Sequence, residues 1–368
     1  MKRLRLIWIF VVMAALAGCV KTEMVPGGNA EVTFNVFNAG PYVPTTKAES
    51  LLSVDGGIES FKSKGFLHAE GVNGTQDFFG ANGETISWNG TDHIWAPSHP
   101  YYWPKSSNSY VNFVSWYATD GTNAIAPTSV TESSFVINNR TIGASDNIMV
   151  ANPAWRFNNN ASIEYYRFNG VVNGVPTLFK HMLGKVSVTF TTSPTTDPDD
   201  ANTTYQVTIT SASIAGVYLS GTLSLSATDP ETAATTSNWT AATANYLWTP
   251  TGNTGSITMG TGATQPQALQ ALNRRSVLPQ ELTENSVLNV TYSITTKVNN
   301  IVVSTETNIT ASVLLNTIEK AGGIPIDAWL PNKIYNYGIT INPVSNLIVV
   351  TPTLESDWGS DTGTISIE

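Results

Sequence analysis

The sequence predicts an all-β protein made of two tandem Greek-key-type β-sandwich domains with few short helices. Apolar residues alternate with polar ones over short runs, as at Val186, Val188 and Phe190, and many of these residues are β-branched or aromatic. Turn signals such as Asn82-Gly83 separate the runs, and an apolar period near 3.6 residues is almost absent. Many short antiparallel strands at this spacing are typical of sandwiches and Greek-key folds.

The expected strands follow the alternating runs along the chain. They lie around residues 32–36, 111–114, 186–190, 207–209, 219–225, 288–292 and 339–341. Residues 267–275 and 316–321 are expected to form short helices of about two turns or less. The stretch 227–243, rich in Thr, Ser and Ala, is expected to be a long loop, because the strands on both sides of it fit one domain.

Length predicts two domains. About 350 residues remain after loss of a leader, which is more than one hydrophobic core of ordinary size accommodates. Turn signals gather at Asn169-Gly170 and Asn173-Gly174, and a strong strand is expected to begin at Leu178. We therefore assign residues 32–177 to an N-terminal β-sandwich domain and residues 178–368 to a C-terminal one.

The N-terminus has the parts of an export signal. Basic residues at positions 2, 3 and 5 precede an apolar run, residues 6–16, that is shorter than the roughly 20 residues a transmembrane helix needs. Leu16-Ala17-Gly18-Cys19 then places small residues before a cysteine, the pattern of a bacterial lipoprotein signal. Residues 1–18 are thus predicted to be removed and Cys19 to carry diacylglycerol and palmitate; a plain secretory signal is the alternative. Residues 19–31 are expected to form a flexible tether.

Composition agrees with export. Cys19 is the only cysteine, so lipidation leaves no thiol for a disulfide, a nucleophile or a metal site. Loss of residues 1–18 removes three of the 18 basic residues and none of the 27 acidic ones, which leaves a net charge of −12. So acidic a chain is not expected to bind nucleic acid or to hold a membrane through a basic patch. The lipid on Cys19 would be its membrane anchor.

The sequence predicts no catalytic, cofactor or metal site. His93 and His99 flank a tryptophan at a spacing without a metal-binding precedent, and no carboxylate pair stands beside them. For His181, at the start of a strand, a buried structural role is favoured. The turn Asp197-Pro198-Asp199-Asp200 lacks the distal glutamate of a calcium loop, so a solvated turn is favoured. Nucleophile-elbow, phosphate-loop and glycosidase patterns are missing from the sequence.

Several segments follow one another in an order that a known family shares. They are Tyr101-Tyr102-Trp103-Pro104, residues 110–117, residues 146–151, residues 179–188, Leu278-Pro279-Gln280, residues 329–337 and Trp358. By these segments and by the lipoprotein signal, the chain resembles the fimbrillin-like lipoproteins of Bacteroidota, the subunits of strand-exchange pili. The resemblance extends over most of the chain that follows the signal peptide.

The resemblance implies both a function and an assembly route. A pilin of this family is a structural or adhesive subunit of a surface fimbria, exported as an outer-membrane lipoprotein. Proteolysis removes its first strand, and a strand from a neighbouring pilin subunit fills the groove that opens. In this chain residues 32–38 would be the displaced strand, with Val32, Phe34 and Val36 on one face.

The resemblance also implies a processing site and candidate donor strands. Lys47, which precedes Ala48, is the only basic residue between positions 21 and 62, so cleavage is expected after it. Residues 347–350 and 365–367 are strand-like and suit a donor role. For residues 347–350, a final strand paired within its own domain is favoured. Stalk, tip and anchor roles all remain open.

Crowded aromatic residues support an alternative. Trp88, Trp95, Tyr102 and Trp103 lie within a short stretch, and exposed rings of this kind stack on sugars. The protein would then be a surface lipoprotein that binds a glycan receptor without polymerising. A role in the first domain's core is favoured for these rings, and their exposure distinguishes the two readings.

Overall fold

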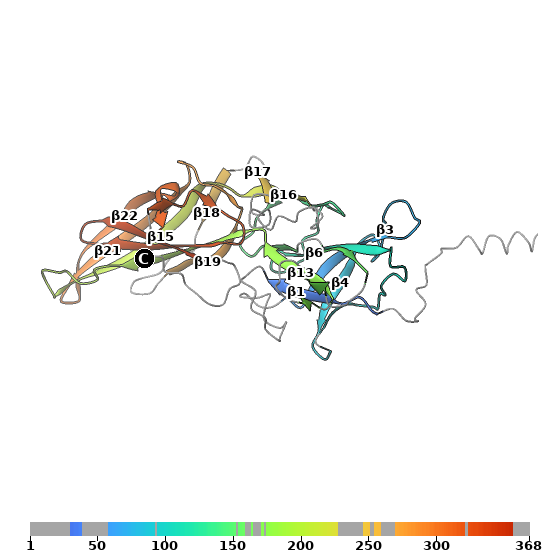
Figure 1. Ribbon diagram of the computed structural model, residues 1–368. Coiled ribbons are helices and arrows are strands. Elements are labelled where there is room, and N and C mark those ends of the chain that lie inside the picture. The colour runs from blue at the N-terminus through green and yellow to red at the C-terminus, as the bar shows by residue number, and fades with distance from the viewer. Residues whose placement is uncertain are drawn as a thin grey trace, which may run out of the picture.

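The structure is a computed structural model that describes residues 30–38, 58–92, 94–151, 154–158, 163–164, 171–172, 174–226, 246–250, 254–258, 269–320 and 323–355. Strands make up nearly all of its regular structure, which confirms the predicted all-β fold. Figure 1 shows two lobes, with the early strands in one and the late strands in the other. Within the described part, no helix is long and apolar enough to cross a membrane.

Among its described residues, the first half of the chain forms thirteen strands. They are β1 (Phe34–Asn38), β2 (Ser60–His68), β3 (Gln76–Asp77), β4 (Glu84–Asn89), β5 (Ile94–Pro97), β6 (Tyr110–Thr119), β7 (Ser129–Thr131), β8 (Ser134–Thr141), β9 (Asn147–Ala151), β10 (Ala154–Phe157), β11 (Ile163–Glu164), β12 (Val171–Val172) and β13 (Val175–His181).

The described residues of the second half form the other strands and one 3-10 helix. They are β14 (Gly184–Thr192), β15 (Thr203–Tyr218), β16 (Ser220–Ser226), β17 (Tyr246–Pro250), β18 (Thr254–Thr258), β19 (Leu269–Val277), β20 (Gln280–Glu281), β21 (Val287–Val298), β22 (Ile301–Leu314), η2 (Leu315–Thr317), β23 (Glu319–Lys320), β24 (Ile324–Pro325), β25 (Ala328–Trp329), β26 (Ile334–Asn342) and β27 (Leu347–Glu355).

Strand pairing closes the first lobe into a ring. β6 pairs with β9 on one side and β2 on the other, so the order β6-β9-β13-β1-β5-β4-β2 returns to β6. Alternation along these strands turns every second side chain inward, and the interior is a cluster that includes Phe61, Phe113 and Phe179. β1 is therefore an internal member of a closed ring and not an edge strand.

The second lobe is a sandwich of two four-stranded sheets. One sheet has the order β19-β14-β26-β27 and the other the order β18-β15-β21-β22. Their shared core includes the fully buried Trp329, Tyr292 and Tyr337, and the Trp329 indole N–H donates to the Tyr337 hydroxyl at 3.0 Å. β27 pairs with β26 throughout, which confirms that residues 347–350 belong to a strand paired within its own lobe.

A third sheet joins the two halves of the sequence. Its order is β17-β16-β8-β7, so β16 of the second half pairs with β8 of the first and with β17 on its other side. A separate core, which contains Phe135, Leu223 and Trp116, lies between this sheet and the outer face of β6. The strands β6, β16 and β17 are labelled in Figure 1. The predicted division between residues 177 and 178 stays a prediction.

Both predicted helices are wrong. Residues 269–277 form β19, because the ladder with β14 outweighs the helical spacing of Leu269 and Leu272. In the other segment only Leu315–Thr317 forms a turn of 3-10 helix, and Ile318 returns to extended backbone before β23. The predicted loop 227–243 and Trp358 lie outside the described residues.

Candidate functional site

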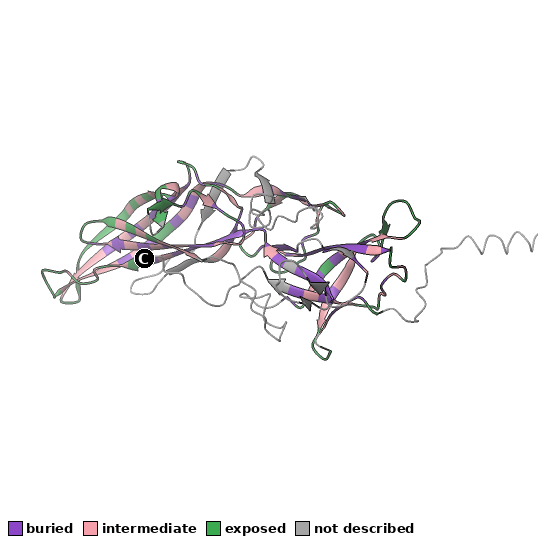
Figure 2. Ribbon diagram, viewed as in Figure 1, coloured by how far each residue is buried: buried purple, intermediate pink, exposed green. Residues whose placement is uncertain are grey.

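The candidate site is β1 and the strands that enclose it. Val32, Phe34 and Val36 are only 1%, 4% and 1% exposed, and all three belong to the core cluster inside the ring. Thr33 and Asn35, on the opposite face, are half-buried. The predicted alternation is therefore present, and its apolar face packs in the core of the first lobe. Figure 2 colours the ribbon by burial, with buried residues in purple.

Backbone pairing holds this segment between two unlike partners. β1 runs parallel to β13, from Phe34 opposite Val175 onward, but its pairing with β5 is limited to Phe34 opposite Trp95. Just before β1, the Val32 N–H donates to the Tyr101 carbonyl oxygen at 2.7 Å. The pairing of β1 with β5 is therefore limited to one residue, whereas its pairing with β13 extends along the whole strand.

Aromatic contacts centre on Phe34. Its ring meets Phe61 at 5.7 Å and Phe113 at 5.5 Å between centroids, both edge-on, and lies 6.3 Å from Phe79. Edge-on pairs of this kind stabilise a core by about 0.5–1.5 kcal/mol beyond the area that they bury. Phe34 is thus the side chain that binds β1 most firmly to the interior.

A glycine permits the close approach of β13 to β1. Gly174 has a φ of +93°, and a Cβ placed on it would lie 2.9 Å from the Thr33 carbonyl oxygen. The next amide, Val175 N–H, donates to that same oxygen at 2.8 Å. The sequence marked Asn173-Gly174 as a turn but did not reveal this contact, because the contact joins segments far apart in the chain.

The aromatic residues proposed for sugar stacking have different surroundings. Trp95 and Trp103 are 4% and 2% exposed and pack in the core, whereas Trp88 and Tyr102 are half-buried. The Trp88 and Trp95 rings are inclined by 53°, so they do not form one flat platform. This arrangement favours a core role for Trp95 and Trp103.

A small polar network lies beside the residues that precede β1, since it includes Tyr101, whose carbonyl oxygen accepts a hydrogen bond from the Val32 N–H. The Tyr101 hydroxyl donates to Glu84 Oε2 at 3.1 Å, and His99 Nδ1 lies 3.3 Å from the same oxygen. Burial raises the pKa of Glu84, but hydrogen bonds from the Thr85 N–H, the Ser98 hydroxyl and the Tyr101 hydroxyl, with His99 nearby, lower it overall. Burial and then Glu84 raise the pKa of Tyr101 to about 12, so its hydroxyl stays a donor at neutral pH.

The residues weighed for catalysis or metal binding have structural surroundings. His181 is buried, its Nδ1–H donates to Asn147 Oδ1 at 3.0 Å, and burial lowers its pKa well below the usual value. Asp197 accepts hydrogen bonds from the Tyr205 hydroxyl and the Asp199 N–H, as expected of a turn. Within the described residues, no three His, Cys, Asp or Glu side chains gather closely enough to hold a metal ion.

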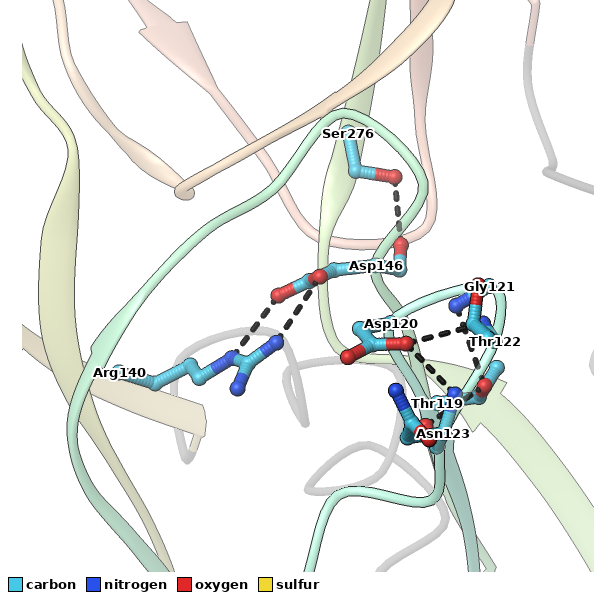
Figure 3. Close-up of polar contacts among 8 residues, drawn as sticks. All are labelled: Thr119, Asp120, Gly121, Thr122, Asn123, Arg140, Asp146 and Ser276. Atoms are coloured by element: carbon cyan, nitrogen blue, oxygen red, sulfur yellow. Dashed lines mark hydrogen bonds and ion pairs between the residues drawn. The ribbon is translucent and has the colours of Figure 1, made fainter.

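An ion pair that the sequence did not reveal fixes the segment 146–151. The Arg140 guanidinium donates two hydrogen bonds to the Asp146 carboxylate, at 3.0 and 3.1 Å. The Asp146 side chain is 1% exposed. The Ser276 hydroxyl, at the end of β19, donates to the Asp146 carbonyl oxygen at 2.6 Å (Figure 3). Asp146 therefore connects the start of β9 with both β8 and a strand of the second half.

Other predicted site residues are not part of this description. Cys19, Lys47, Ala48 and residues 365–367 lie outside the described residues. Lipidation, processing and any donor role of the tail remain predictions.

Comparison with known proteins gives a sequence match and similar folds. The profile of a family described as fimbrillin-like matches residues 66–358. A fimbrial protein from Bacteroides vulgatus has a similar fold, at 13% identity and a TM-score of 0.54, over 89% of this chain and 99% of that one. The tip fimbrial protein Mfa3 from Porphyromonas gingivalis, with a C-terminal truncation, matches at 9% identity and a TM-score of 0.40, over 82% of this chain and 94% of that one. Among curated proteins, none matches the chain.

Proposed function

We infer the function from the premise that this chain belongs to the fimbrillin-like family, whose profile matches residues 66–358. It is therefore a structural or adhesion subunit of a cell-surface fimbria, a class of protein that associates with other pilin subunits. The finer statements that follow are proposals about how this subunit reaches the surface and assembles.

We propose that the subunit is exported as an outer-membrane lipoprotein. The support is the sequence alone: residues 1–18 have the signal pattern, and Cys19 stands where lipidation requires it. Metabolic labelling with a palmitate analogue tests this, with Cys19→Ala as the control. Labelling of both proteins, or of neither, would contradict the proposal.

Assembly is proposed to proceed by strand exchange after cleavage between Lys47 and Ala48. The observation that carries this is the position of β1, which closes a ring and inserts Val32, Phe34 and Val36 into its interior. Loss of the strand would leave β13 without its parallel partner and open the interior along the full length of β1. An incoming strand with alternating apolar residues would restore both the hydrogen bonds and the side-chain packing.

The apolar burial that β1 contributes is large compared with the stability of a whole domain. Burial of a large apolar side chain contributes about 1.5–3 kcal/mol, so the three inward residues of the first strand together contribute roughly 5–9 kcal/mol. Whole domains are stable by only about 5–15 kcal/mol. A subunit that has lost its first strand is therefore expected to bind a replacement tightly.

The test is limited trypsin treatment of the folded protein, followed by N-terminal sequencing, intact mass and light scattering. Cleavage confined to Lys47, with residues 48–368 still folded and forming oligomers, is expected. Lys47→Gln should block both cleavage and oligomer formation. A resistant Lys47, or cleavage that only unfolds the chain, would contradict strand exchange.

A peptide competition sharpens this test. A synthetic peptide of residues 30–38 should fill the open groove and stop oligomer growth. The matched control carries Ser at Val32, Phe34 and Val36 and should have no effect, because it cannot fill the interior. Equal inhibition by both peptides would contradict the proposal.

Glycan binding through Trp88, Trp95 and Trp103 has less support as a function, since the Trp95 and Trp103 rings are buried.

A further inference from the structure

A second site lies in the first lobe, where β2 and β6 separate. There β6 changes its partner: Lys62 of β2 pairs with Trp116, whereas the Ile125 N–H donates to the Ala118 carbonyl oxygen two residues further along β6. Because β2 and residues 124–130 diverge from this point, a cavity of about 770 Å³ remains between them. Its volume falls within the range typical of small-molecule sites.

The lining of this cavity has an unusual charge for an acidic protein. The chain has 27 acidic and 18 basic residues, yet the lining contains two lysines, Lys62 and Lys64, and no acidic residue. Lys64 lies 3.7 Å from Asp77, which is outside the cavity lining. Lys62 is exposed, and among the described residues it has no ion-pair partner. A ligand with a carboxylate would complement the Lys62 ammonium group, since the Lys64 ammonium group already lies beside Asp77.

The rest of the lining favours a sugar over a peptide. Its uncharged polar side chains are mainly hydroxyls, with one amide, which both donate and accept hydrogen bonds as sugar hydroxyls do. They belong to Ser60, Asn82, Thr85, Tyr117, Thr119, Thr128 and Ser129. The Thr119 hydroxyl already donates to the Asn123 carbonyl oxygen, and the Thr128 hydroxyl already accepts from the Asn138 N–H, so the others are the principal partners for a sugar. Ala118, Ile125 and Pro127 add apolar surface beside Trp116. Lys62 is paired on both sides, with Thr85 and with Trp116, whereas Ser60 and Phe61 pair only with β4, and β7 is an edge strand that pairs only with β8. A peptide that adds as a strand would therefore find no free backbone at Lys62, the residue whose ammonium group the ligand must reach.

We propose that this cavity binds an acidic sugar, with its carboxylate on the Lys62 ammonium group and its hydroxyls on the surrounding hydroxyl side chains. The site is distinct from the aromatic residues considered above, because Trp88, Trp95, Tyr102 and Trp103 are not part of its lining. It also requires no loss of β1, so it operates in the subunit before and after assembly.

The experiment uses saturation-transfer NMR and titration of the whole exported chain with glucuronate, glucose and tetraglutamate. Glucuronate is expected to bind, glucose to bind at least about fivefold more weakly, and Lys62→Gln to weaken glucuronate binding by about five- to tenfold. Lys105→Gln, a change at another exposed lysine outside the cavity, is the matched control and should leave binding unchanged.

Three results would overturn the proposal. Equal binding of glucose and glucuronate would remove the role of the carboxylate. Binding of tetraglutamate but not glucuronate, with loss in Lys62→Gln, would identify the cavity as an acidic-peptide site. No binding of glucuronate at millimolar concentration would exclude an acidic-sugar site. Because the Lys62 side chain is exposed, its substitution leaves the fold intact and each result can be interpreted.

Discussion

Replacing Phe34 by Ala should loosen the first strand more than any other single change on it. The Phe34 ring is 4% exposed and packs edge-on against Phe61 and Phe113. Truncation of a buried phenylalanine costs about 3–5 kcal/mol, which corresponds to about a 200- to 5,000-fold change in the equilibrium for release of β1. Hydrogen exchange at the Val175 amide measures this release directly, because that N–H donates to the Thr33 carbonyl oxygen.

Asn35→Ala is the matched control, since Asn35 belongs to the same strand but lies half-buried on the opposite face. It should change the free energy of release by less than about 0.5 kcal/mol. If Phe34→Ala and Asn35→Ala accelerate exchange at Val175 equally, the interior packing of β1 does not hold the strand. An effect of Phe34→Ala below about 1 kcal/mol would refute the argument from burial.

Three further changes test other contacts. Gly174→Ala should speed release of β1 in the same exchange assay more than Gly71→Ala does; both glycines have positive φ, but a Cβ at Gly71 meets no atom within 4 Å. Arg140→Met should lower the free energy of unfolding in urea by about 1.5–3 kcal/mol, because it removes the guanidinium that donates two hydrogen bonds to the buried Asp146 carboxylate, while Arg275 still compensates part of that charge. Arg140→Met combined with Asp146→Asn should recover part of the loss. Because burial depresses the pKa of His181 in the folded chain, the unfolded chain binds its proton first as pH falls below 6.5, and stability should then decline by up to about 1.4 kcal/mol per pH unit. Urea unfolding between pH 7 and 5 measures this slope, which should flatten in His181→Gln; an unchanged slope would assign it to other groups.

Sequence patterns predicted local structure better than they predicted partners. The alternation of Val32, Phe34 and Val36 was enough to predict a strand with one apolar face, because that property depends on neighbouring residues alone. The same residues do not specify a parallel pairing with β13, some 140 residues further along the chain, since register depends on the turns and cores between them. Gly174 shows the same limit: its turn was predictable, but its contact with Thr33 was not.

Two further differences arise from tertiary context. Leu269 and Leu272 have the spacing of a helix face, yet β14 offers a ladder to these residues and they form β19. In the candidate site, the sequence favoured a core role for the whole aromatic cluster but could not separate Trp95 and Trp103, which are buried, from Trp88 and Tyr102, which are half-buried. Arg140 and Asp146 are six residues apart on either side of a turn, a separation with no recognisable signature in an isolated sequence.

The sheet that β8 shares with β16 has a mechanical consequence for a subunit loaded in series within a fibre. Two connections would share the tension between the two lobes. One is the chain segment 182–183, which links β13 to β14. The other is the hydrogen-bonded ladder between β8 and β16, with the core that contains Phe135 and Leu223. A hinge built from one covalent strand would stretch under such a load. A junction that must break a ladder and a core in the same event would instead transmit the load as one stiff body.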